Sequence, residues 1–164
     1  MDLNKINFRS TVTKTDAEIV RDIVTSSGYF NAEEIDIAVE LVTENLAKGV
    51  ASGYEFLFAE SEEKETLGYS CYGKIPGTKN SYALYWIAVH EKFRNLGIGR
   101  ILLKETEIDI FNQGGIGIYV ETSSRQQYNS TRAFYANNSY QLKAQFEDYY
   151  DKGDDLVFFV KRKS

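Results

Sequence analysis

The residues of this sequence that point most directly to chemistry are an arginine and two glycines at fixed spacing, Arg94-x-x-Gly97-x-Gly99. The stretch before them, Tyr82 to Val89, is apolar at odd and even positions alike, which predicts a central strand buried on both faces. After Gly97 a helix is predicted, with an apolar stripe of Ile98, Ile101, Leu102, Ile108 and Phe111 and a polar side of Arg100, Lys104, Glu105 and Glu107. A glycine turn at a helix N-terminus exposes unpaired main-chain N–H groups and the positive end of the helix dipole, so the stretch predicts an anion site.

Two familiar glycine loops do not match this anion site. A dinucleotide fingerprint needs a third glycine where Leu102 stands, and a P-loop needs lysine and serine or threonine where Arg100 and Ile101 follow Gly99. An ordinary helix start with a solvated Arg94 is the alternative. Each glycine at the first helical positions costs about 1 kcal/mol relative to alanine, which favours a close approach of the backbone to a ligand.

The pattern resembles the acyl-CoA signature of the GNAT superfamily of N-acetyltransferases, Arg/Gln-x-x-Gly-x-Gly/Ala after a strand. The resemblance implies acetyl-CoA as the cofactor. It implies that the loop amides bind the pyrophosphate of coenzyme A, that the strand end pairs with the pantetheine arm, and that the N–H near Val89 faces the carbonyl oxygen. The loop comprises Arg94, Asn95, Leu96, Gly97, Ile98, Gly99 and Arg100, and the strand end Ile87, Ala88 and Val89.

A second segment, Asn129 to Tyr135, resembles the other signature of that family. The resemblance implies that Tyr135 points its hydroxyl toward the cofactor sulfur and that Asn129 contacts the pantetheine or its phosphates. The alternative for Tyr135 is a core aromatic residue. A phenol is a weaker acid than a thiol, so full proton transfer is uphill by about 2 kcal/mol and hydrogen-bond donation is the safer description. The family's glycine after this helix is missing, and Asn138 is expected to take the left-handed conformation instead.

The general base is less clearly marked. The strand before Ile87 holds no glutamate, which leaves Glu121 at the end of the next predicted strand, where partial burial would raise its pKa. The alternative is a structural carboxylate bonded to the hydroxyls of residues 122–124. His90 has a suitable ordinary pKa, but the family directs that loop away from the acceptor. Cys71 is expected to be a buried apolar residue rather than a nucleophile.

Four aromatic residues are candidates for the wall of an acceptor pocket: Tyr29, Phe30, Trp86 and Tyr149. Tyr29 and Phe30 stand in a predicted turn, where they plug the core or line a pocket. Tyr149 belongs to the acidic stretch Asp148 to Asp155, which resembles the hairpin loop that overhangs the acceptor entrance in the family. A merely solvated loop is the alternative reading of this stretch.

Composition narrows the class of protein. The chain has 164 residues, of which 43% are hydrophobic, so it can bury a core and is expected to form one domain, 1–164. No apolar run reaches membrane length and the N-terminus has no signal core, so we expect a cytoplasmic protein without membrane contact. One cysteine and one histidine predict no metal site. The net charge of -5 argues against nucleic-acid binding and mildly favours an amine substrate.

The order of predicted elements indicates an α/β (α+β) fold. We expect strands at Asn4–Thr11, Tyr54–Glu60, Thr66–Tyr72, Tyr82–Val89, Ile118–Glu121, 140–146 (alternating and half-exposed) and Leu156–Val160. We expect one helix after a capping box at Thr15–Glu18, one after a second box at Asn31 and Glu34, one from Gly97, and one over Ser130–Asn138 with Ala133, Phe134 and Tyr135 inside. The family resemblance implies a single mixed, mostly antiparallel seven-stranded sheet with about four helices, in which strands four and five are parallel and splayed.

The function predicted from the sequence is direct transfer of an acetyl group from acetyl-CoA to a primary amine. The acceptor is a small molecule, an amino acid or a peptide. The rivals are a catalytically inactive acyl-CoA sensor and a protein-interaction module without cofactor. A homodimer is possible, and nothing in the sequence decides it.

Overall fold

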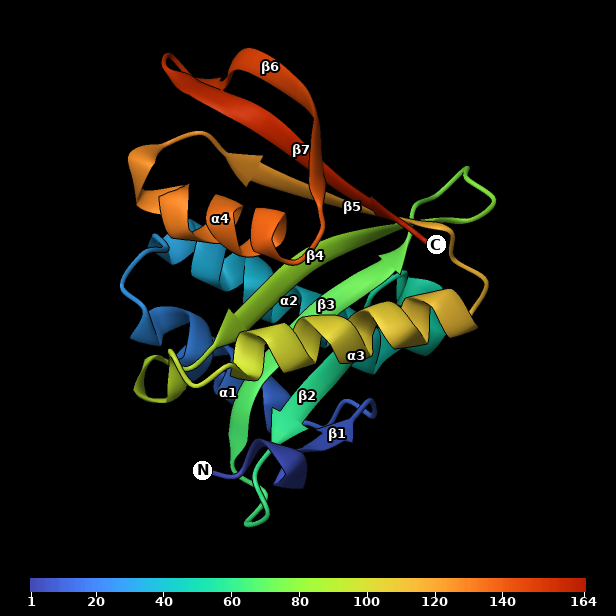
Figure 1. Cartoon of the computed structure of the whole chain (residues 1–164). Helices are drawn as coiled ribbons and strands as arrows, with labels where there is room; N and C mark the ends of the chain where they lie inside the picture. The colour runs from blue at the N-terminus through green and yellow to red at the C-terminus, as the bar shows by residue number, and fades with distance from the viewer. The chain divides into compact units, whose positions relative to one another are not determined.

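The computed structural model describes residues 1–164 and contains seven strands and four α-helices (Figure 1). The helices are α1 (Asp16–Ser26), α2 (Ala32–Lys48), α3 (Ile98–Asn112) and α4 (Asn129–Asn137). The strands are β1 (Asn7–Arg9), β2 (Glu55–Glu60), β3 (Thr66–Lys74), β4 (Ser81–Val89), β5 (Gly117–Ser123), β6 (Gln141–Asp151) and β7 (Asp154–Arg162). No helix combines the length and the apolar character needed to cross a membrane. The cytoplasmic location stays a prediction.

The strands form one sheet in the order β1-β2-β3-β4-β5-β7-β6. The parallel pair joins Ser81–Ala83 of β4 to Gly117–Tyr119 of β5, while β2 with β3 and β5 with β7 are antiparallel, which confirms the mixed sheet. The chain divides into two compact units, one of Met1–Gly73 with Trp86–Asp109 and one of Lys74–Tyr85 with Ile110–Ser164. The single domain and the splay of β4 and β5 stay predictions.

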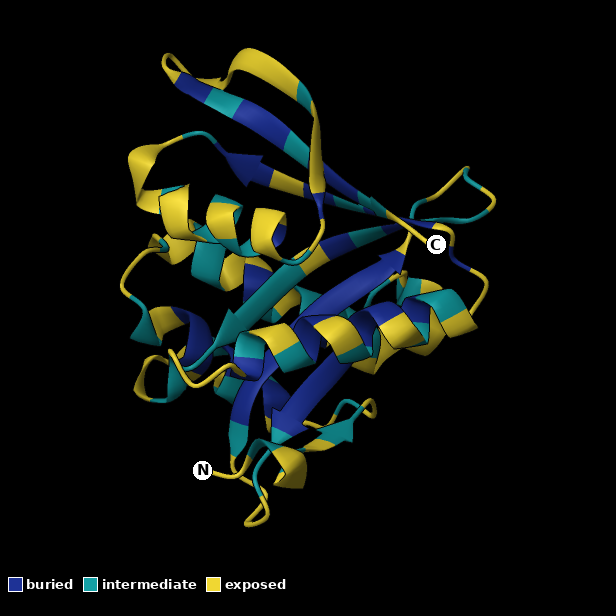
Figure 2. Ribbon diagram, in the orientation of Figure 1, coloured by how far each residue is buried: buried dark blue, intermediate teal, exposed yellow.

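In the first unit, helices α1 and α2 cover one face of the strands and α3 covers the other (Figure 1). The strand β3 is therefore buried on both faces, as Figure 2 shows. Tyr69 and Cys71 of β3 belong to the core cluster under α1 and α2, and burial raises the pKa of the Cys71 thiol, so Cys71 is the apolar residue expected. On the other face Ser70 bonds the Thr106 hydroxyl of α3 at 2.7 Å.

The two predicted capping boxes have different outcomes. The box at the start of α2 is confirmed: the Glu34 amide donates to Asn31 Oδ1 at 2.8 Å and the Asn31 amide donates to Glu34 Oε1 at 3.2 Å. The box at Thr15 is wrong, because no side-chain bond caps α1 there. The buried carboxylate of Asp16 instead pairs with the Arg9 guanidinium of β1, at 2.8 and 2.9 Å.

The apolar stripe predicted for α3 is partly wrong. Ile108, expected in the stripe, is exposed, whereas Glu107, expected on the polar side, is buried, as is Thr106. Burial of Thr106 is tolerated because its hydroxyl bonds both Ser70 and the Leu102 carbonyl, the latter at 2.7 Å. Ile98 and Leu102 are buried as predicted.

In the second unit, α4 contacts the β7–β6 ribbon through aromatic rings. The Tyr135 ring lies 5.4 Å from the Tyr140 ring and 5.9 Å from the Phe159 ring of β7. Ala133, expected inside, is exposed. The left-handed residue after the helix is Ser139, at φ 70°, and not Asn138, at φ −107°. The turn is closed by the Tyr140 amide, which donates to the Tyr135 carbonyl at 3.0 Å.

The alternating pattern predicted for β6 does not produce a half-buried strand. Leu142 and Phe146 are about half exposed. Leu142 pairs with Phe159 and Ala144 with the adjacent Phe158, so Lys143 is an extra residue that places Leu142 and Ala144 on opposite faces.

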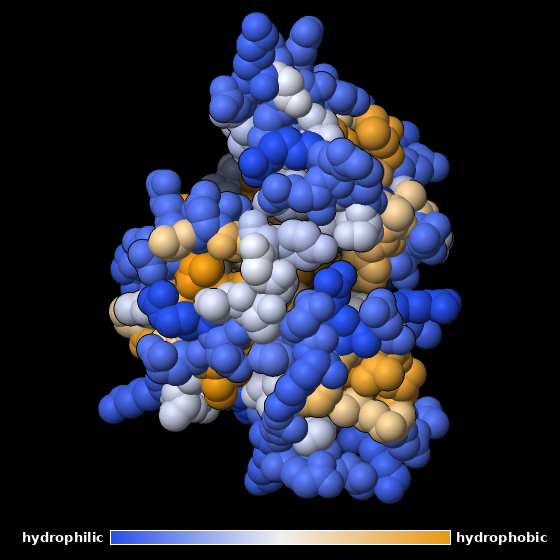
Figure 3. Space-filling view, turned by 90° about the vertical axis from the view of Figure 1, so that its left-hand side faces the viewer, coloured by the Kyte–Doolittle hydropathy of each residue, from blue (hydrophilic) through white to orange (hydrophobic).

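Apolar patches elsewhere on the surface are small and separated by hydrophilic side chains on the face seen in Figure 3.

Candidate active site

The anion loop lies where predicted, between β4 and α3. The Gly97 carbonyl accepts from the Ile101 amide at 3.3 Å, so the helix begins directly after Gly97. The amides of Ile98, Gly99 and Arg100 are then first-turn donors, which have no acceptor within the helix. Asn95 at φ 63° and Gly97 at φ 86° adopt the left-handed conformation that bends the chain into this turn. The loop can therefore hold a phosphate on main-chain N–H groups.

Arg94 is held by two neighbours. Its guanidinium pairs with Glu91 at 3.2 Å and lies over the Tyr29 ring at 6.0 Å. The hydrogen bond to Glu91 is the main cause that raises the pKa of Arg94. Arg94 is therefore partly buried and paired, and the freely solvated alternative does not describe it.

The end of β4 is less buried than its apolar sequence predicts. Tyr82 and Leu84 are buried, but the strand from Trp86 to Val89 is only half-buried (Figure 2). The Trp86 ring contacts the Phe30 ring edge-on at 5.0 Å, and both pack against the core of the first unit. Tyr29 is 43% exposed. Phe30 and Trp86 are thus part of a core wall, and Tyr29 faces solvent.

Gly68 of β3, which the sequence did not single out, leaves room for the β4 main chain. A Cβ at this position would lie 2.6 Å from the Ala88 carbonyl oxygen and 3.1 Å from the Val89 Cα, so β4 would have to move. We expect Gly68→Ala to lower the free energy of unfolding by about 1 to 3 kcal/mol, the usual cost of overpacking. Urea unfolding of the wild type and the variant measures this difference in stability. An unchanged midpoint would show that β4 can shift without a cost in free energy.

Tyr135 in α4 is buried, and its ring lies among other aromatic rings. Its side chain is 4% exposed, with ring contacts to Phe134, Tyr140 and Phe159. Burial raises the pKa of its hydroxyl above the ordinary value of 10.0. The phenol therefore stays protonated across the physiological range and can act as a hydrogen-bond donor.

Asn129 begins α4 and is tied to an arginine that sequence reasoning missed. The Arg132 guanidinium donates to the Asn129 side-chain oxygen, to the Ser123 carbonyl at 2.5 Å and to the Arg125 carbonyl at 3.0 Å. These bonds join the end of β5, the following turn and the first turn of α4. The only sequence signal was the spacing of three residues, which places Arg132 on the same helix face as Asn129.

Glu121 lies in β5 opposite Phe158 of β7, and it is exposed rather than partly buried. The partial burial expected from its position is therefore wrong. The neighbouring hydroxyls do not bond it: Ser123 bonds Asp154, and Ser124 accepts from the Asp155 amide at 2.8 Å. Burial, and after it the negative charge of Glu121, raises the pKa of the nearby Tyr150 to about 12.

Tyr149 lies in a bulged part of β6 rather than in a loop. Phe146 pairs with Leu156 and Asp151 with Asp154, so residues 147–150 bulge out opposite Asp155. The Asp155 carboxylate accepts from the Asp148 amide at 3.0 Å and from Gln145 at 2.7 Å, and these bonds lower the pKa of Asp155. Tyr149 is 60% exposed and its ring meets that of Tyr150 at 5.1 Å. The predicted loop is thus a strand bulge that presents two tyrosines.

The predicted residues fall into two groups. The first unit brings together the anion loop, Ile87–Val89, Trp86, Phe30 and Tyr29. The second unit holds Glu121, Asn129, Tyr135 and Tyr149. No cluster of three or more histidine, cysteine or acidic side chains offers a metal site.

The family model described as "Acetyltransferase (GNAT) domain" matches residues 52–142, which include the anion loop and Tyr135. The chain belongs to the GNAT family. The GNAT sheet, with its single parallel pair at β4 and β5, accounts for the strand order found here. The position of the loop, after β4 and at the start of α3, agrees with the family signature.

Similar GNAT proteins extend this result. A crystal structure of a putative GNAT-family acetyltransferase from Desulfovibrio desulfuricans is 41% identical, with 96% of this chain and 98% of that chain covered and a TM-score of 0.93. An uncharacterized N-acetyltransferase of Methanocaldococcus jannaschii is 32% identical over 77 residues, 47% of this chain and about half (49%) of that protein. The PaiA N-acetyltransferase of Thermoplasma acidophilum, solved with coenzyme A, shares the fold at 19% identity, with 96% and 99% covered and a TM-score of 0.71.

Proposed function

We propose that this GNAT protein is an acetyl-CoA-dependent N-acetyltransferase that acts on a primary amine by direct transfer. The observation that carries the proposal is the loop at Arg94–Arg100, in which Gly97 is left-handed, the first-turn amides of α3 follow directly, and Arg94 adds a positive charge. These donors suit a pyrophosphate, which is bound through main-chain N–H groups and positive charge. The crystallised PaiA complex with coenzyme A supports the choice of cofactor.

When bound, acetyl-CoA supplies the acetyl group as a thioester. The residues proposed to bind it are Arg94, Asn95, Leu96, Gly97, Ile98, Gly99 and Arg100 at the pyrophosphate, Ile87, Ala88 and Val89 at the pantetheine arm, and Asn129. Main-chain N–H groups can stabilise negative charge as it develops on a carbonyl oxygen, and we assign this role to the amide of Val89.

Tyr135 is assigned the role of donor to the departing thiolate. Because burial raises the pKa of its hydroxyl, the group is present in the protonated form at every physiological pH. The same shift makes full proton transfer less favourable than it is for a solvated tyrosine. Tyr135 therefore stabilises the developing thiolate by donating a hydrogen bond, and the proton that finally neutralises the thiolate comes from solvent.

Glu121 is the proposed acceptor of the proton that the amine loses. An amine with a pKa near 10.4 costs about 4 to 5 kcal/mol to deprotonate at pH 7, so a carboxylate nearby or at the end of a water chain assists. The exposure of Glu121 supports a relay through water rather than a buried base.

Replacing Glu121 with glutamine tests this assignment. We expect the rate to fall by up to about ten-fold at neutral pH, where the amine is mostly protonated, and the deficit to shrink as the pH approaches the pKa of the acceptor. Rates measured across pH with a saturating acceptor check the prediction. A ratio of wild-type to variant rate that is constant across pH would exclude Glu121 as the base.

The acceptor class is proposed from the four aromatic residues that the sequence singles out. Tyr29 and Tyr149 are exposed, and Phe30 and Trp86 form a half-buried wall, which supports an amine with an apolar portion. Small amines, amino acids and peptides remain members of this class, and homodimer formation and a cytoplasmic location stay predictions.

The experiment is a thiol-release assay with acetyl-CoA and a panel of amines drawn from these three groups. Acceptor-dependent release that exceeds spontaneous hydrolysis is the expected result. Tight acetyl-CoA binding with no release for any acceptor would instead favour an inactive acyl-CoA sensor.

A further inference from the structure

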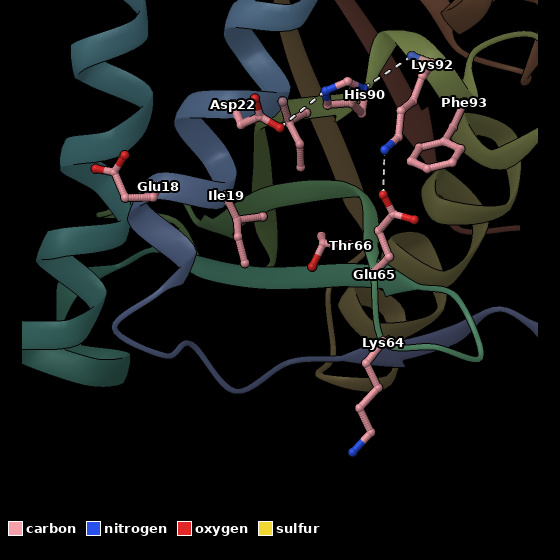
Figure 4. A pocket seen from close by; sticks show the side chains of 10 residues that line it. Glu18, Ile19, Asp22, Lys64, Glu65, Thr66, His90, Lys92 and Phe93 are labelled. Carbon is pink, nitrogen blue, oxygen red and sulfur yellow. Dashed lines mark hydrogen bonds and ion pairs between the residues drawn. The ribbon is translucent and has the colours of Figure 1, made fainter.

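The guanidinium of Arg132 in α4 is bonded differently from the basic side chains around the cavity of the first unit. That cavity, of about 400 Å³, lies between α1, the turn from β2 to β3 and the segment after β4 (Figure 4). There Lys92 Nζ pairs with Glu65 at 2.7 Å, and His90 Nε2 lies 3.3 Å from the Asp22 carboxylate. Arg132 bonds three oxygens, and none of them belongs to a carboxylate. Its bonds therefore fix geometry and do not neutralise charge.

The turn that leads from β5 into α4 depends on Arg132. Gln126–Tyr128 form one short helical turn, and neither this turn nor α4 begins with a side-chain cap. One guanidinium nitrogen donates to the carbonyls of Ser123, at 2.5 Å, and Arg125, at 3.0 Å, and the other donates to the Asn129 side-chain oxygen. Arg132 thereby ties the first turn of α4 to the end of β5.

The anchor of these bonds is itself fixed. Ser123 is buried, and its hydroxyl bonds the Asp154 carboxylate of β7. The same hydroxyl accepts from the Arg125 amide at 3.0 Å, and the Arg125 guanidinium pairs with Asp154 at 3.1 Å. Arg132 therefore holds Asn129 at a defined place relative to β5 and β7.

The bond from Arg132 also decides which way the Asn129 carboxamide faces. A guanidinium carries N–H donors and no acceptor, so only the oxygen of an amide can face it. The NH₂ group of Asn129 is therefore turned away from Arg132, and the residue is exposed. Asn129 thus offers a donor to a ligand. The matching acceptors in coenzyme A are phosphate oxygens and the amide carbonyls of pantetheine.

We propose that Arg132 is a positioning residue of the cofactor site. It orients the Asn129 amide so that the NH₂ group donates to an acceptor oxygen of bound acetyl-CoA, on a phosphate or on a pantetheine carbonyl. The inference rests on the proposed function, in which Asn129 contacts the cofactor, and it adds a residue that acts through Asn129.

A double-mutant cycle on acetyl-CoA affinity tests this role, because it separates an action through Asn129 from damage to the fold. Arg132→Met alone should weaken binding about five-fold, the worth of one positioned hydrogen bond. In an Asn129→Ala background the same substitution should change the affinity by less than about two-fold. Calorimetric titration gives the four dissociation constants, and urea unfolding reports the stability of each variant separately.

Equal losses in the two backgrounds would mean that Arg132 acts on the fold alone, and this result would overturn the proposal. No loss in Arg132→Met would overturn it as well. The control for lost charge is Arg21→Met, which removes a guanidinium from an exposed ion pair with Asp36 and should bind acetyl-CoA like the wild type.

Asn129→Asp tests the orientation of the amide directly. The new carboxylate still accepts from Arg132 but has no N–H to offer, so we expect at least about ten-fold weaker binding of acetyl-CoA. An acidic residue in the first turn of a helix favours the helix, so the variant is expected to fold. Wild-type affinity in Asn129→Asp would overturn the donor role.

Titration with 3′-phospho-ADP, the nucleotide half of coenzyme A without pantetheine, identifies the acceptor oxygen. A loss of affinity for this ligand in Arg132→Met and Asn129→Asp assigns a phosphate, and a loss seen only with acetyl-CoA assigns a pantetheine carbonyl. A wild-type protein that binds no acetyl-CoA would contradict the proposed function. If the wild type binds acetyl-CoA and both variants bind it equally well, this inference alone fails.

Discussion

Replacing Gly99 with glutamate is expected to weaken acetyl-CoA binding by more than 100-fold. Gly99 lies in the first turn of α3, where its amide is one of the donors proposed for the pyrophosphate. A carboxylate there places negative charge among the donors, and like charges held together cost several kcal/mol. Gly99 is the better position for this test than Gly97, because the left-handed φ of 86° at Gly97 strains any other residue. Calorimetric titration of the purified variant measures the loss.

The matched control is Ile108→Glu. It adds the same charge to an exposed position of the same helix, about 13 Å further along at 1.5 Å per residue. We expect this variant to bind acetyl-CoA like the wild type. If Gly99→Glu, folded by circular dichroism, also binds normally, the loop assignment fails. If both variants lose binding, net charge rather than the loop is responsible.

Replacing Tyr135 with phenylalanine is expected to lower turnover at least ten-fold while the affinity for acetyl-CoA changes little. The substitution removes only a hydroxyl, so the ring contacts with Tyr140 and Phe159 are retained. Loss of a positioned acid–base group usually costs about 10² to 10⁴ in rate, and a pure hydrogen-bond donor falls at the low end. Steady-state rates with a saturating acceptor, together with calorimetry, separate the two effects.

Tyr140→Phe is the control for Tyr135. Tyr140 is equally buried and belongs to the same aromatic cluster, with Lys161 over its ring at 5.5 Å. A loss of stability without a loss of rate is the expected result at Tyr140. Equal turnover of Tyr135→Phe and wild type would remove Tyr135 from the mechanism, and equal losses in the two variants would indicate a packing effect.

The fold was predictable where local sequence decides the structure. The capping box of Asn31 and Glu34 needs only residues three apart, and it forms as predicted. The box at Thr15 did not form, because the Thr15 backbone is already helical and its side chain makes no cap bond. The Asp16 carboxylate accepts from the Thr13 amide at 2.6 Å instead and pairs with Arg9 of β1, a partner that no local pattern indicates. The pattern of β6 failed because this edge strand is exposed on both faces and its register shifts twice, at Leu142/Ala144 and at Phe146/Asp151. Burial of Thr106 likewise depends on Ser70, which lies 36 residues away.

The candidate site was likewise predictable only where local sequence decides the structure. The anion loop was predictable because the required glycine conformation and the helix start are encoded within a few residues. Its neighbours were not: Tyr29 beside Arg94, Arg132 bonded to Asn129, and Gly68 under β4 are contacts between distant segments. The hydroxyls beside Glu121 found partners in β7, which the sequence order does not reveal.

The most direct test of this account is calorimetric titration of the purified protein with acetyl-CoA. The account predicts saturable binding in the micromolar range with one site per chain, because the first-turn amides of α3 and Arg94 form a ready anion site. A folded sample that shows no binding would contradict the cofactor assignment, and with it the proposed acetyltransferase activity.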